Sequence, residues 1–223
     1  MILPYSITTF DANKFDFVKV VSEIFARHDL KDLQQLSDNK YKEQFQVGMD
    51  SSTVFHEKFY DKFREGWSEL NDMYMDFIKE VVAPGYDEDF LFQAFPTFRV
   101  HLPKNVAVGA FHNDAEFHHP KGEVNYIIPL TNSSKTASVW VESEPGKKDF
   151  IDIILQVGEL VRFNGNELTH GNKKNETSNT RVSMDFRVLP LSKYDESNSG
   201  ESITRNTKFK EGEYYKRFTH GRN

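Results

Sequence analysis

A mainly β fold with helices before it, either a β-sandwich or a jelly roll, is predicted by three observations. The first 85 residues carry apolar side chains at helical spacing. After them come seven or eight short β-type segments, separated by turns rich in Gly, Asn, Pro and Lys, with no helix between them. Phe contributes 20 of the 223 residues, which supplies bulky side chains for a core. We expect a single domain with helical support at 1–85, a β core at 86–191 and a C-terminal tail at 192–223.

Two helical stretches are expected before the β core. Residues 17–25 carry apolar side chains at helical spacing, and leucines at 30, 33 and 36 continue the pattern. Residues 37–50 are polar and contain turn formers, so they predict a loop. A second helix should begin near Ser51 or Ser52, either of which is a suitable N-cap, and end at Ala83-Pro84-Gly85. Its apolar stripe is expected to pack on the outside of a sheet. The stripe consists of Phe55, Phe59, Phe63, Trp67, Leu70, Tyr74, Phe77 and Val81.

The β core is expected to consist of short strands that alternate with turns. The expected strands are 90–95, 97–102, 106–114, 123–130, 137–143, 149–155, 159–165 and 180–191. The tail that follows is polar and rich in Ser, Asn, Lys and Glu. Two interpretations of it are open: it wraps the β core through its aromatic residues at 209, 214, 215 and 218, or it is partly disordered.

Composition and charge exclude several classes of partner. The formal net charge is −6 with no long basic run, so nucleic acid is not an expected partner. The chain has no cysteine and therefore neither disulfides nor thiolate metal sites. A mean hydropathy of −0.62 indicates a soluble protein. No apolar run approaches the length of a membrane span, and the first residues lack a signal-peptide pattern. We expect a cytoplasmic protein without a membrane partner, and the sequence leaves its oligomeric state open.

The segment AVGAFHNDAEFHHP holds the most informative residues of the chain. His112 and Asp114 are two positions apart, and on a strand such residues point to the same face. His170, in NELTHGN, adds a second imidazole at another strand end. Two His and one carboxylate form a facial triad with open positions, which is typical of non-haem Fe(II) oxygenases. Zn(II), Mn(II), Ni(II) and Co(II) also suit these ligands, whereas an isolated HND would predict only a hydrogen-bonded His–Asp pair.

Arg181 follows His170 after one short polar turn, and Ser183 shares its face of the expected strand. A guanidinium there is suited to clamp a carboxylate with two parallel hydrogen bonds, and the serine hydroxyl adds a donor. A carboxylate of 2-oxoglutarate, whose other end chelates iron, fits this arrangement. Arg187 lies on the same face and is a rival for the role. The alternative for Arg181 is a surface ion pair.

These motifs occur in a fixed order, and together they resemble a known superfamily. From about residue 99 to 191 the chain is similar to the 2-oxoglutarate/Fe(II)-dependent oxygenases, and within them to the streptomycin-biosynthesis-type (StrG-like) branch. The segments that carry the likeness are RVHLPKN, AFHNDAEFHHP, GEVNYIIPLT, VWVESEPGKKDF and LTHGNKKNETSNTRVSMDFRVLPLS. The resemblance implies a double-stranded β-helix, that is, a cupin-like jelly-roll core flanked by α-helices. It also implies Fe(II), 2-oxoglutarate and O₂ as cofactor and cosubstrates.

Further polar residues near these motifs are candidates for binding cosubstrate or substrate. Asn125, on the strand after HND, is expected to hydrogen-bond the cosubstrate or to orient the substrate, and an amide that only satisfies the core is the alternative. The candidate substrate residues are Arg99, His119, Trp140, Glu142 and Arg187, and a structural role remains open for each. His118 and His119 are also considered as part of a second metal site.

The function expected from these residues is a dioxygenase that hydroxylates a small polar metabolite and releases succinate and CO₂. An amino acid, a sugar or an aminocyclitol derivative is the expected type of substrate, by analogy with the family. The carboxylate of Asp114 argues against a halogenase, in which halide replaces that ligand. Two alternatives remain open: a non-catalytic cupin-like protein that binds a metal or a small molecule, and an oxygenase that hydroxylates protein.

Overall fold

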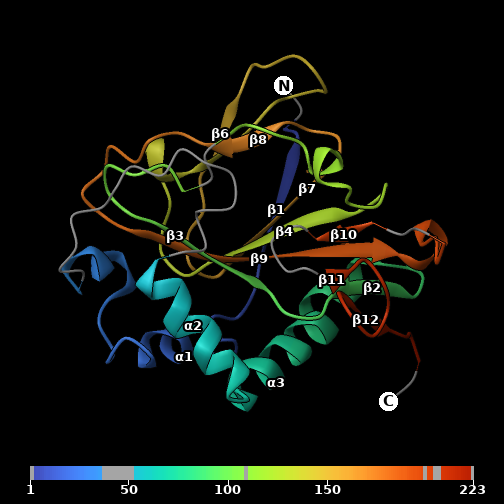
Figure 1. The fold of residues 1–223 in the computed structure, drawn as a ribbon, viewed down its shortest axis with the longest axis horizontal. Helices are drawn as coiled ribbons and strands as arrows, with labels where there is room; N and C mark the ends of the chain where they lie inside the picture. Colours follow the sequence, from blue (N-terminus) through green and yellow to red (C-terminus); the bar gives the residue numbers. More distant parts are fainter. Residues whose placement is uncertain (1–2, 37–52, 108–109, 198–199, 203–206, 222–223) are drawn as a thin grey trace.

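The protein consists of three layers in the computed structural model, which describes residues 3–36, 53–107, 110–197, 200–202 and 207–221. Helices cover one face of a seven-stranded antiparallel sheet, and a three-stranded antiparallel sheet lies over its other face (Figure 1). One hydrophobic cluster fills the space between the helices and the large sheet, and a smaller cluster joins the two sheets. This arrangement confirms the mainly β prediction with helices on the outside.

The helical layer contains two helices where the sequence predicted one continuous helix from about residue 51 to 82. They are α2 (Val54–Arg64) and α3 (Ser68–Phe77), and shorter turns follow at Ile78–Val82 and Ala83–Gly85. The break occurs at Gly66, whose φ of +92° is accessible to glycine at little cost. The apolar stripe still faces the sheet, because most of its members are buried. Thr53 is the N-cap of α2, whereas Ser51, Ser52 and the whole of the expected 37–50 loop lie outside the described residues.

The start of the chain also differs from the predicted all-helical support. β1 (Tyr5–Thr9) pairs with β7 (Glu159–Phe163) and forms an edge of the large sheet. Four of its five residues are exposed, so it has no alternation of buried and exposed side chains by which a strand is recognised. The expected helix follows as α1 (Phe17–Glu23), and the leucine repeat forms a 3₁₀ helix, η1 (Leu30–Leu36).

The large sheet has the order β1-β7-β4-β9-β2-β12, and every pairing in it is antiparallel. Its longest strand, β9, pairs along one side with β4 and along the other with β3 and then β2. Besides β1 and β7, the strands are β2 (Phe90–Gln93), β3 (Thr97–His101), β4 (Val124–Pro129), β9 (Arg181–Pro190) and β12 (Tyr215–Phe218).

Side chains of β9 alternate strictly between the two faces of the sheet. Val182, Met184, Phe186 and Val188 are fully buried in the core beneath the helices. The intervening residues at 181, 183, 185 and 187 line a cavity on the opposite face. A strand has a side-chain period of two, so one sequence supplies both the core and the cavity wall.

The small sheet covers that cavity and has the order β6-β5-β8. Its strands are β5 (Val139–Val141), β6 (Ile151–Ile153) and β8 (His170–Asn172). The predicted strand at 106–114 is wrong for the part that the structure describes. There the backbone makes a single bridge, between His112 and His170, and then enters a 3₁₀ helix, η4 (Asp114–Phe117). No helix in the described ranges is long and apolar enough to cross a bilayer.

The tail packs on the β core, as the first of its two interpretations predicted for its aromatic residues. After the short 3₁₀ helix Leu191–Lys193, β10 (Glu201–Ser202) pairs with β11 (Thr207–Lys208), and β12 pairs with β2. Phe209, Tyr214 and Tyr215 form a third cluster with two leucines of the sheet. Phe218 stacks on Phe90 at a centroid distance of 5.0 Å.

Phe98 connects the helical layer to the sheet, and we expect its truncation to destabilise the protein strongly. Its ring is 1% exposed and stacks on Phe59 at a centroid distance of 4.3 Å. Phe98→Ala should lower the free energy of unfolding by about 3–5 kcal/mol, because it leaves a cavity in a packed core. Urea denaturation measures the change. Val157→Ala is the control, since Val157 is 41% exposed, and it should change stability by no more than about 0.5 kcal/mol. Equal losses in both variants would contradict this account of the core.

Candidate active site

His112 and His170 are held side by side by their own backbones. The amide of each donates to the carbonyl of the other, at 3.0 and 2.8 Å, and the two ring centroids are 4.8 Å apart. Gly171 allows this approach, because a Cβ at that position would lie 3.0 Å from the ring of Phe111. Two residues that are 58 positions apart in the sequence (170 − 112) are therefore brought together by a main-chain bridge.

Hydrogen bonds fix the same tautomer for both imidazoles. Nδ1 of His112 lies 2.9 Å from the carbonyl oxygen of Ala110, and Nδ1 of His170 lies 3.0 Å from that of Leu168. A carbonyl oxygen only accepts, so each Nδ1 must carry the proton and each Nε2 keeps its lone pair. Burial lowers the pKa of His170, which favours the neutral ring at pH 7. Both Nε2 atoms are therefore acceptors, the form in which histidine binds metal.

Asp114 places one carboxylate oxygen opposite these two nitrogens. Asp114 is the first residue of η4, whose N-cap Asn113 forms a capping box with Glu116. The backbone amide of Asp114 donates to the carbonyl of Gly165 at 2.8 Å. Oδ1 lies 3.6 Å from Nε2 of His112 and 3.6 Å from Nε2 of His170. The capped turn thus delivers the carboxylate, although the sequence analysis expected a strand to do so.

The other oxygen of Asp114, Oδ2, is fully occupied by protein donors. It accepts hydrogen bonds from Nδ2 of Asn125 and from Nε of Arg187, both at 2.8 Å. Burial by itself would raise the pKa of the Asp114 carboxyl, but the charge of Arg187 holds that pKa well below its ordinary value. Asp114 is therefore ionised, with one oxygen restrained and the other directed at the histidines.

Three acceptor atoms thus converge with no hydrogen between them, which is unfavourable unless a cation lies there. The three ligand atoms lie within 4.8 Å of one another, and no second group of three such side chains is found in the described ranges. His118, exposed in a left-handed conformation, and His119 do not form the second metal site that was considered. Two imidazole nitrogens and one carboxylate oxygen fit a divalent transition metal and leave coordination positions for other ligands.

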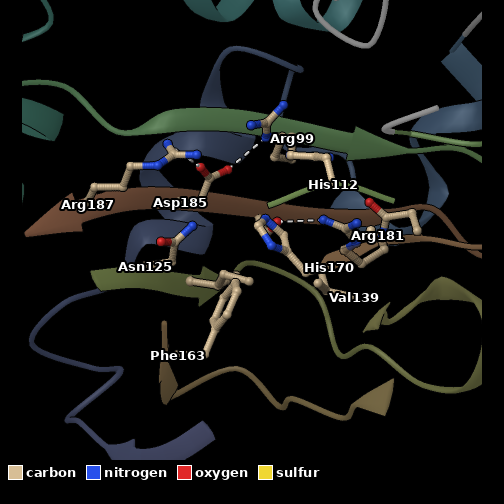
Figure 2. A pocket seen from close by; sticks show the side chains of 13 residues that line it. Arg99, His112, Asn125, Val139, Phe163, His170, Arg181, Asp185 and Arg187 are labelled. Atoms are coloured by element: carbon tan, nitrogen blue, oxygen red, sulfur yellow. Dashed lines mark hydrogen bonds and ion pairs between the residues drawn. The ribbon is translucent and has the colours of Figure 1, made fainter. Parts of the chain in front are cut away.

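His112 and His170 line a cavity between the two sheets. Figure 2 shows the polar wall of this cavity. It is formed by the cavity-facing side chains of β9 and by Asn125 of β4, and His170 faces them. Ile127, Val139 and Phe163 supply the apolar part of the lining. The cavity therefore combines a small number of directed polar groups with an apolar surround, as small-molecule sites do.

Arg181 and Ser183 lie on the cavity wall, as the sequence predicted for a carboxylate clamp. Arg181 is 5% exposed, donates from Nη1 to the Ser183 hydroxyl at 2.8 Å, and donates from Nε to the Ala137 carbonyl at 3.2 Å. Both of these acceptors are neutral groups, and the guanidinium lies on the cavity wall. Burial and the charge of Arg181 lower the pKa of the adjacent His101 to about 3, so that ring stays neutral.

Arg187, the rival for the clamp, is surrounded by carboxylates of the protein. Besides its bond to Asp114, its Nη1 lies 3.7 Å from Asp185 and its Nε lies 3.9 Å from Glu123. Asp185 in turn accepts from Nε of Arg99 at 2.8 Å. Figure 2 shows Arg187 and Asp185 on β9 with Arg99 of β3 beside them, so the carboxylates that surround Arg187 belong to the protein.

Three other candidate residues lie outside the cavity lining. His119 bonds Glu123 through Nδ1 at 2.6 Å, beneath the tail, where its ring packs on Phe209. Trp140 has Nζ of Lys173 3.2 Å above its ring. Glu142 is fully buried and accepts backbone amides at 169, 146 and 148, so it fixes two loops. Their roles in substrate binding are not supported by these positions, whereas Arg99 does line the cavity.

Two charged residues of the site were not singled out by the sequence analysis. Asp185 shares the cavity face of β9 with Arg181, and the period of two along that strand was a sufficient signal for it. Glu123 is fully buried beside Arg187 and makes contacts with distant residues. No local pattern marks it, because an isolated Glu before a strand usually faces solvent.

Similarity to known proteins identifies the family of this chain. No protein-family model matches the chain. Streptomycin biosynthesis protein StrG from Streptomyces griseus is 34% identical over 211 residues, which cover 95% of this chain and 97% of StrG. The chain belongs to the StrG family. Because nearly the full length of both proteins is aligned, the relationship spans the StrG-like helices, β core and tail alike.

Solved structures extend the relationship of this StrG-family chain at the level of the fold. The apo form of EctD from S. alaskensis superposes with a TM-score of 0.51 over 92% of this chain and 80% of EctD, at 12% identity. EctD with bound 2-oxoglutarate and 5-hydroxyectoine gives a TM-score of 0.48, with 15% identity and coverage of 89% and 76%. The apo EctD match shows a shared fold and so confirms the jelly-roll prediction.

Gly165 offers a test of how Asp114 is positioned. A Cβ at this residue would lie 2.6 Å from Nδ2 of Asn125, the atom that donates to Oδ2 of Asp114. Gly165→Ala should displace the amide and weaken Co(II) binding about tenfold, since partners of metal ligands typically affect affinity by that order. Visible spectroscopy of Co(II) titrations measures the affinity. Gly85→Ala is the control, because its Cβ meets nothing within 4 Å. Unchanged affinity in Gly165→Ala would show that Asn125 does not support the ligand.

Proposed function

We propose that this StrG-family protein is an Fe(II)- and 2-oxoglutarate-dependent dioxygenase that hydroxylates a small polar metabolite and releases succinate and CO₂. The observation that carries the proposal is that two members of the His112–Asp114–His170 group, the histidines, line the same cavity as the buried Arg181–Ser183 pair. The first is the ligand set of non-haem Fe(II) oxygenases, and the second is suited to a dicarboxylate cosubstrate.

Each group has a distinct role in the proposed reaction. Ferrous iron bound by the triad supplies the activation of O₂ that is coupled to oxidative decarboxylation of 2-oxoglutarate. Arg181 and Ser183 hold the distal carboxylate of 2-oxoglutarate and so fix which way it enters the cavity. Asn125 and Arg187 restrain Asp114, so the carboxylate keeps one oxygen for the metal. The presence of that carboxylate supports hydroxylation over halogenation.

The lining of the cavity supports a small polar substrate. The Arg99–Asp185 ion pair, with both side chains partly exposed, provides a polar wall for hydroxyl or charged groups. Apolar residues at 127, 139 and 163 exclude water from the reacting end.

A non-catalytic cupin-like binding protein is the alternative function. A module that binds only a metal has no need of a clamp for a carboxylate, so the presence of Arg181 and Ser183 on the cavity wall supports the oxygenase. An oxygenase that hydroxylates protein would use the same metal centre and clamp, so only its substrate distinguishes it.

The metal centre itself can be tested without a substrate. Anaerobic addition of Fe(II) and 2-oxoglutarate should give a weak visible charge-transfer band, and His112→Ala should abolish it because one of three ligands is lost. His118→Asn is the matched control: His118 is an exposed histidine with a φ of +64°, which Asn tolerates. The control should retain the band. If the unmodified protein shows neither the band nor 2-oxoglutarate binding, the oxygenase assignment is wrong.

The clamp is tested separately from the metal. Arg181→Gln should weaken 2-oxoglutarate binding about 10- to 100-fold, because a hydrogen-bonded charge contributes about 1.5–3 kcal/mol. Co(II) affinity should stay near that of the unmodified protein, since none of the contacts described for Arg181 involves a metal ligand. Calorimetric titration of the Co(II)-loaded protein measures the first quantity. An Arg181→Gln variant that binds 2-oxoglutarate normally would transfer the role to another residue.

A further inference from the structure

Glu123 is a buried carboxylate that the proposed reaction does not use. It is fully buried just before β4 and does not line the cavity. Oε2 lies 2.6 Å from Nδ1 of His119, and Oε1 accepts the hydroxyl of Tyr215 from the first residue of β12. A buried carboxyl group with incomplete hydrogen bonding is strongly destabilising, so these two partners are needed to hold Glu123 in place.

Arg187 lies between this carboxylate and the metal ligand. Its Nε is 2.8 Å from Oδ2 of Asp114 and 3.9 Å from Oε2 of Glu123. The shorter distance is a hydrogen bond, and the longer one is only an electrostatic contact. Since His119 and Tyr215 already satisfy both oxygens of Glu123, the Nε–H of Arg187 remains with Asp114.

We propose that Glu123 and Tyr215 are positioning residues of the metal centre, through which the C-terminal strand β12 sets the affinity of the His112–Asp114–His170 site. The proposal rests on the metal site of the proposed function. Tyr215 donates a hydrogen bond to Glu123. Glu123 lies close enough to Arg187 to compete with Asp114 for its Nε–H, and the hydrogen bond from Arg187 restrains Asp114. Residues of the tail are thereby linked to a metal ligand about 100 positions earlier (215 − 114 = 101) without touching the cavity.

The chemistry of Tyr215 suits this role. Burial, followed by the nearby Glu123 charge, raises the pKa of Tyr215 well above its ordinary value, so the hydroxyl remains protonated and can donate. Its ring is fully buried among the aromatic residues of the tail and against β2, which holds the hydroxyl in one direction. Loss of the hydroxyl leaves Oε1 of Glu123 without a donor. Glu123 then competes with Asp114 for Arg187, and Oδ2 of Asp114 loses part of its restraint.

Co(II) binding measured by anaerobic visible titration tests the link directly, because it requires neither 2-oxoglutarate nor turnover. Tyr215→Phe should raise the Kd for Co(II) about three- to tenfold, somewhat less than the effect typical of a residue that contacts a metal ligand directly. The visible spectrum of bound Co(II) should also change, since the carboxylate ligand is held less firmly. A role limited to stability would alter the melting temperature and leave both quantities unchanged.

Tyr86→Phe is the control. Tyr86 is a buried tyrosine whose hydroxyl lies 2.9 Å from that of Tyr126 and near Arg162. Both variants lose a buried hydroxyl, so both should lose stability, by about 0.5–1.5 kcal/mol. Only Tyr215→Phe should change Co(II) affinity. Equal Kd values for the two variants would overturn the inference.

A double-mutant cycle with Glu123→Gln tests the route of the effect. If Tyr215 acts through the charge of Glu123, adding Tyr215→Phe to Glu123→Gln should change the Kd by less than about twofold, because interacting residues are not additive. An additive effect would refute the route through Glu123. His112→Ala separates the two proposals. If His112→Ala abolishes Co(II) binding while Tyr215→Phe binds Co(II) like Tyr86→Phe, the metal centre is supported and the positioning role is refuted. If the unmodified protein binds no Co(II), both fall.

Discussion

The site depends on the different surroundings of the two carboxylate oxygens of the buried Asp114. Asn125 and Arg187 occupy Oδ2 of Asp114, so Oδ1 is left to face the two imidazoles. A symmetric carboxylate free to rotate would present either oxygen, or both, to a metal. Restraint of one oxygen by a charge-assisted bond keeps the second in a single direction, and it also holds the group in its ionised form. Metal affinity and ligand geometry therefore have the same physical origin.

The fold provides this restraint by using one strand for several tasks. β9 carries Arg181 at its start and Arg187 six residues later, so the expected cosubstrate clamp and the support of the metal ligand are held at a fixed separation. Its opposite face is fully buried beneath the helices, which fixes the register of the strand. The two histidines are placed differently, by a main-chain bridge between a loop and the small sheet. The cavity forms where these two kinds of support meet.

The features that could be predicted from the sequence are those that leave a pattern in neighbouring residues. The HND and LTHGN motifs, the alternation along 181–190 and the aromatic stripe depend on short spacings, and each predicted its element or cluster. The break at Gly66 was missed because a single glycine within a helical pattern is tolerated, and β1 was missed because an exposed edge strand lacks alternation. Glu123 was missed for another reason: its partner in β12 is 92 residues away, and no local pattern encodes such a contact.

The period of two along β9 limits how this protein can diversify. Insertion or deletion of one residue within the strand would turn Met184 and Phe186 towards the cavity and place charged side chains under the helices. Length changes are therefore excluded there and confined to connecting loops, such as the one after β5 that Glu142 anchors through backbone amides. Relatives with the same reaction chemistry are expected to keep β9 at constant length and to acquire new substrates through the loops that border the cavity.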